Sequence, residues 1–87
     1  MPDPRQLRVG DRIRFVALPD EWSAPGYFVH DESREFLQAL IDRGRPSRVR
    51  RIDDDGIPWI EARLRADDGT IVHHDWGIRE ASGWVRL

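Results

Sequence analysis

Five arginines lie within the nine residues from Arg43 to Arg51, and they form a cluster of positively charged side chains. Guanidinium groups bind phosphate through paired hydrogen bonds, so the cluster predicts a nucleic-acid contact. The residues that would make this contact are Arg45, Arg48, Arg50 and Arg51. However, the chain has a net charge of -2, whereas nonspecific nucleic-acid binders usually have a pI above about 9. The alternative is a solvated strand face whose arginines pair with acidic residues on neighbouring strands.

Aromatic residues form a second candidate surface. The chain has four tryptophans and one tyrosine, and Trp, Tyr and Arg dominate the energetics of protein interfaces. Binding of a protein or peptide partner is therefore the function that we expect first. The residues that would form this surface are Trp22, Tyr27, Trp59, Arg63 and Trp84. The alternative is intramolecular, with Trp22 and Phe28 filling a gap between strand and helix and Trp59 covering Trp84 across neighbouring strands.

Histidines offer a third kind of chemistry. His73 and Asp75 share one face of a predicted strand while His74 points to the other, and His30 is the remaining candidate ligand for a metal or acid–base site. No spacing matches a metal-ligand motif, so we expect no metal and no cofactor. The chain has no cysteine, and its four serines fall in predicted loops or at a helix cap. We therefore expect that the protein is not an enzyme.

The elements that position these residues must come from one small domain. A chain of 87 residues buries only about 60–65% of its unfolded surface, which allows one core. No apolar run approaches the length of about 20 residues that a membrane span requires, and the sequence from Met1 to Arg5 is not a signal peptide. We therefore expect a cytoplasmic protein.

The first half of the chain predicts one strand and one helix. Residues 1–8 contain two prolines and are expected to be flexible, so that the folded domain spans residues 9–87. Apolar residues alternate with arginines over 9–18, which predicts a half-buried strand. A loop over 19–29 leads to a helix with Asp31 or Ser33 as its cap, and Gly44 ends this helix.

The second half predicts strands joined by tight turns. Short β-type runs cover 48–52, 59–65, 70–75 and 84–87. Asp-Gly pairs at 55–56 and 68–69 indicate hairpin turns, because glycine accepts the positive φ that such turns require. Over 59–65 the residues alternate, so Ile60, Ala62 and Leu64 should point inward and the others outward.

Five strands and one helix around one core predict a mainly β fold, most economically a closed small barrel. With the helix in the long connection after the first strand, the chain resembles Src-homology-3-like barrels of bacterial proteins. The resemblance rests on Val-Gly-Asp-Arg-Ile-Arg-Phe at 9–15 and on Gly-Trp-Val at 83–85. It implies the fold but no ligand, because residues 17–20 lack the tyrosine pair of the peptide-binding members. Such barrels are often only partly closed, so we expect a monomer or a weak homodimer.

Overall fold

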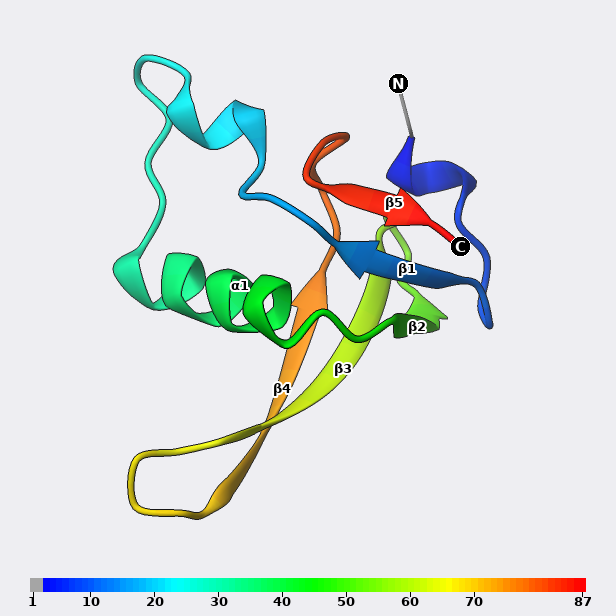
Figure 1. Cartoon of the computed structure of the whole chain (residues 1–87). Helices are drawn as coiled ribbons and strands as arrows, with labels where there is room; N and C mark the ends of the chain where they lie inside the picture. Colours follow the sequence, from blue (N-terminus) through cyan, green and yellow to red (C-terminus); the bar gives the residue numbers. More distant parts are fainter. Residues whose placement is uncertain (1–2) are drawn as a thin grey trace.

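The computed structural model describes residues 3–87 and contains five strands and one α-helix (Figure 1). Met1 and Pro2, part of the predicted flexible segment, lie outside the described residues. In chain order, the elements are the 3-10 helix η1 (Pro4–Gln6), β1 (Arg12–Phe15), the 3-10 helix η2 (Asp20–Ser23), α1 (Asp31–Arg43), β2 (Ser47–Ile52), β3 (Pro58–Arg65), β4 (Ile71–Gly77) and β5 (Trp84–Arg86). The predicted mainly β class with a single α-helix is therefore confirmed.

The five strands form one open antiparallel sheet in the order β4-β3-β2-β1-β5. The predicted closed barrel is wrong, since β4 and β5 are edge strands of this sheet and do not pair with each other. The sheet stays open because α1, and not a pairing of β4 with β5, covers this side of the core. In Figure 1 the helix α1 lies across the opening between β1 and β4. Its Phe36 packs against Trp76 of β4 with 5.3 Å between ring centroids, so side chains close the core where strand pairing does not.

The two predicted hairpins are present, joining β2 to β3 and β3 to β4. Gly56 and Gly69 adopt φ of 81° and 87°, as tight turns require. In the first turn, the Asp53 side chain accepts hydrogen bonds from the backbone N–H of Asp55 and Ile57, each at 2.9 Å. Local turn chemistry therefore determines both hairpins.

The inner face of the sheet carries the core, as the alternation in β3 predicts. Ile60 is 0% and Ala62 is 4% exposed, and Leu64 packs at the edge of the same cluster. They are covered by Phe36, Leu37 and Leu40 of α1. The outward residues of β3 alternate with them and include Glu61 and Arg63. The outer face is consequently free to carry charged groups.

The boundaries of three elements differ from the prediction. Within the described part of segment 1–8, Pro4–Gln6 form η1, and the apolar side chain of Leu7 is 4% exposed because it packs in the core cluster. The first strand covers only Arg12–Phe15, since Val9 is 62% exposed and Gly10 lies in a turn. The residue that precedes α1 is His30, whose side chain makes no capping hydrogen bond, while Gly44 ends the helix as predicted.

Candidate nucleic-acid interface

An arginine groove lies at the junction of α1, β1 and β2, with a cavity volume of about 510 Å³. Its wall is completed by Pro46, Ser47 and Glu61. The arginines that line it are Arg12, Arg43, Arg45, Arg48 and Arg50. Antiparallel pairing places Arg12 of β1 directly opposite Arg48 of β2, and Arg43 is the last residue of α1. Three elements therefore bring positive side chains to one place.

None of these five guanidinium groups is in an ion pair within residues 3–87. The two ion pairs of that part of the chain join His73 to Glu61 and Arg86 to Asp11. Arg43 donates through an Nη nitrogen to the carbonyl of Arg63 at 3.3 Å, and its Nε is buried without a hydrogen-bond partner. The acidic partners of the alternative interpretation are therefore not found for this group within residues 3–87, whereas its other element, a solvated strand face, is present, because Arg48 and Arg50 are exposed on β2.

Arg51 is separated from the groove by a bulge. The register between β2 and β3 shifts between Val49 and Arg51. As a result, the Arg51 guanidinium lies over the Trp59 ring, 4.6 Å from its centroid, and Arg79 lies 5.5 Å from the same ring. The structure thus brings together three of the four predicted nucleic-acid residues. It adds Arg12, which sequence reasoning missed because its neighbour Arg48 is distant along the chain.

Two of the predicted partner-binding aromatics are core residues. Trp22 is 5% and Trp84 is 4% exposed, and each indole N–H donates to Glu80: Trp22 to Oε1 at 2.9 Å and Trp84 to the backbone oxygen at 2.8 Å. Tyr27 is 47% exposed, and its hydroxyl donates to the same Oε1 at 3.5 Å. Partial burial, together with the Glu80 carboxylate, raises the pKa of Tyr27. These contacts connect the loop around η2 to the segment before β5.

The remaining residues of the predicted aromatic surface are Trp59 and Arg63. Trp59 is half-buried, and its indole N–H donates to Asp53 at 2.9 Å, which lowers the pKa of that carboxyl group. Arg63 is exposed on the outer face. The alternative in which Trp59 covers Trp84 across neighbouring strands is wrong, because β3 and β5 are not neighbours in the sheet. Trp76 is partly buried and packs against the core, beside Trp22 and Phe36.

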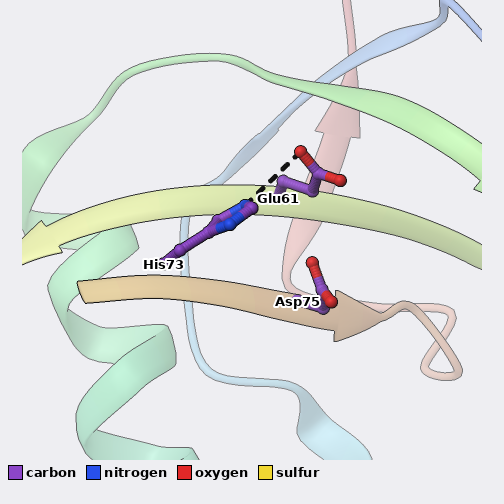
Figure 2. A group of neighbouring side chains, drawn as sticks. All are labelled: Glu61, His73 and Asp75. Atoms are coloured by element: carbon purple, nitrogen blue, oxygen red, sulfur yellow. Dashed lines mark ion pairs between the residues drawn. The ribbon is translucent and has the colours of Figure 1, made fainter.

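A group of three metal-capable side chains lies beside the groove on the outer face (Figure 2). It consists of Glu61 from β3 and of His73 and Asp75 from β4. The alternation that places His73 and Asp75 together was predicted, but the third candidate was His30. That residue instead packs edge-on against Phe28, with 5.0 Å between ring centroids. Glu61 was missed because only the register of β3 with β4 places it opposite Asp75.

Comparison with known proteins adds no relative: no family model matches the chain, and searches of curated proteins and of solved structures found no match. Over residues 3–87, the only α-helix has 13 residues, too few to span a membrane.

Proposed function

We propose that this protein binds nucleic acid through its phosphate groups, with the arginine groove as the contact surface. The observation that carries the proposal is the set of five guanidinium groups that line one groove without an ion pair in residues 3–87. Bringing like charges together is unfavourable unless counterions or an anionic ligand offset their repulsion. A phosphate accepts two parallel hydrogen bonds from one guanidinium, and this makes arginine especially suited to binding it.

A nucleic-acid backbone fits this groove because it presents several anionic groups in succession. Arg48 and Arg50 are two residues apart on β2, and both line the groove. Arg12 extends the row to the neighbouring strand. Contacts of this kind hold the backbone and carry no base information, so we propose binding with little sequence preference.

The dependence of the affinity on salt concentration is the quantitative test of binding through phosphate groups. Each phosphate neutralised on duplex DNA contributes about -0.9 to the slope of log K against log salt concentration, and about -0.7 on a single strand. Contacts by three to five arginines therefore give a slope of about -3 to -4.5 on a duplex. The net charge of -2 on the whole chain opposes long-range attraction, so binding should be detected most easily at low salt.

The experiment is fluorescence anisotropy with a short labelled oligonucleotide, single-stranded and as a duplex, between about 50 and 200 mM salt. The test variant replaces Arg48 and Arg50 with Gln. Its matched control replaces Arg34 and Arg65, two exposed arginines outside the groove, with Gln in the same way. We expect at least a tenfold weaker affinity and a slope reduced by about 2 for the groove variant only.

Three results would overturn the proposal. The first is no binding by the unmodified protein at low salt, and the second is an equal loss in the control variant. The third is competition by poly-glutamate as strong as that by unlabelled oligonucleotide, which would assign the groove to acidic proteins. Folding of every variant is checked by far-ultraviolet circular dichroism.

A protein partner remains the second candidate function, favoured by one observation. Phe28, beside Tyr27 in the loop before α1, is 77% exposed, which is unusual for a large apolar side chain. With Trp22 and Trp84 in the core, this loop is what remains of the predicted aromatic surface, together with Arg63 and the half-buried Trp59. Affinity capture with the unmodified protein and with a Tyr27→Ala, Phe28→Ser variant, compared by mass spectrometry, tests it. Identical captured proteins would remove this candidate.

We also propose that the fold is related to Src-homology-3-like domains. The strand order β4-β3-β2-β1-β5 and the position of α1 between β1 and β2 support a relation to Src-homology-3-like domains. In this proposal the protein is a binding module and not an enzyme, and a cytoplasmic location would give it access to nucleic acid.

A further inference from the structure

We propose that Glu61, His73 and Asp75 bind one divalent transition-metal ion, such as Zn²⁺. Figure 2 shows Glu61 and His73 pointing toward each other from neighbouring strands, with the Asp75 carboxylate on the same face. Asp75 lies directly opposite Glu61 in the register of β3 and β4, and His73 is two residues before Asp75. Three donors from two adjacent strands therefore lie close together on one face of the β3–β4 hairpin.

The spacing of the donor atoms suits a small ion. Two ligand atoms of a tetrahedral zinc ion, each bound at 2.0–2.2 Å, lie about 3.4 Å apart. His73 Nε2 lies 3.4 Å from Glu61 Oε2, which matches this value. A carboxylate oxygen of Asp75 completes the group, in which all donor atoms lie within 4.8 Å of one another. All three residues are exposed, so a side-chain rotation closes the remaining gap.

The charges of the group also call for a cation. Glu61 and Asp75 are directly opposite across two antiparallel strands, and like charges at such positions destabilise a sheet. Glu61 has His73 as its partner, whereas the Asp75 carboxylate has no ion pair within the part of the chain that the structure describes. Although arginines surround the groove, none lies within ion-pair distance of either carboxylate. A bound dication would offset the repulsion between the two carboxylates.

The donor set determines which ion is expected. An imidazole nitrogen suits Zn²⁺, Cu²⁺ and Ni²⁺, while a site of carboxylates alone would suit Mg²⁺ or Ca²⁺. Three protein donors leave a fourth position of tetrahedral zinc open. Since Glu61 also lines the arginine groove, an ion held by Glu61 would lie near an anion bound in that groove. Metal and phosphate should therefore strengthen each other's binding, and this second part rests on the proposed function.

Metal binding by the unliganded protein is tested by isothermal titration with Zn²⁺ in a buffer free of phosphate and other chelating anions. We expect one ion per chain, with at least tenfold weaker binding in His73→Ala and in Asp75→Asn. His30→Ala is the matched control, because His30 is also an exposed histidine and lies outside the group. No Zn²⁺ binding by the unmodified protein, or equal losses in His30→Ala and His73→Ala, would overturn the site. Mg²⁺ bound as tightly as Zn²⁺ would overturn the role of His73.

The coupling is tested by oligonucleotide anisotropy with and without Zn²⁺. We expect severalfold tighter binding with Zn²⁺ for the unmodified protein and no gain for Asp75→Asn. An equal gain in both proteins would refute the coupling through this site. The two failures are distinguishable. If the proposed function is wrong, the oligonucleotide does not bind with or without Zn²⁺, while the Zn²⁺ titration is unchanged.

Discussion

Replacing Gly83 with Ala tests how the end of the chain is held against β1. Gly83 lies just before β5, and its carbonyl accepts hydrogen bonds from Val16 N–H at 2.9 Å and from Ala17 N–H at 3.3 Å. Its φ is 88°, a conformation that residues with a Cβ atom rarely adopt. A Cβ atom here would lie 2.6 Å from the backbone oxygen of Ala17 and 3.2 Å from the nitrogen of Pro19. The substitution therefore adds both backbone strain and a collision with the backbone.

The hairpin glycine Gly69 separates these two effects. Its φ is 87°, but a Cβ atom built there meets nothing within 4 Å. Gly69→Ala should therefore cost only the conformational strain, about 1–2 kcal/mol. Gly83→Ala should cost the same strain and also weaken two hydrogen bonds worth about 0.5–1.5 kcal/mol each, for a total of about 3 kcal/mol. The lower entropy of the unfolded chain with Ala affects both variants alike and cancels in their difference.

Urea unfolding, followed by tryptophan fluorescence and far-ultraviolet circular dichroism, measures this difference. A domain of this size is stable by about 4–13 kcal/mol, so a loss of 3 kcal/mol lowers the midpoint clearly. The buried Trp84 reports directly on the region that the substitution disturbs. Equal free energies of unfolding for the two variants would refute the reasoning, because they would show that the close approach of Gly83 to Ala17 contributes nothing in solution.

Three further predictions concern stability. The hydrogen bond from Ser82 lowers the pKa of Glu21 below 4.5, so the Glu21 carboxylate contributes its full stabilisation above pH 4.5 and loses it as pH falls through the lowered pKa. The difference in urea midpoint between the unmodified protein and Glu21→Gln should therefore shrink on acidification, and a constant difference would contradict this. Asp53→Ala removes the acceptor of two backbone amides and of the Trp59 indole, so we expect a lower urea midpoint and altered tryptophan fluorescence; an unchanged emission spectrum would count against the indole contact. Ile60→Ala, at a side chain that is 0% exposed, should cost about 2–5 kcal/mol in the same unfolding assay, and a loss below about 1 kcal/mol would argue against its place in the core.

The candidate site could be predicted in part because some of its residues are near one another in the chain. Arg45, Arg48 and Arg50 fall together on one short segment, and alternation along β2 places Arg48 and Arg50 on one face. In contrast, Arg12 joins them through the pairing of β1 with β2. Glu61 joins His73 and Asp75 through the register of β3 with β4, a relation that no local pattern contains.

The sequence by itself determined the elements of this fold whose causes are local. Asp-Gly pairs specify tight turns, alternation assigns the two faces of β3, and Gly44 ends α1, since each depends only on nearby residues. Only the tertiary structure decided that the sheet stays open and that Trp22 and Trp84 are core residues. Those outcomes depend on how α1 and the segment around Glu80 pack over the sheet, because burial is set by contacts between residues far apart in the chain.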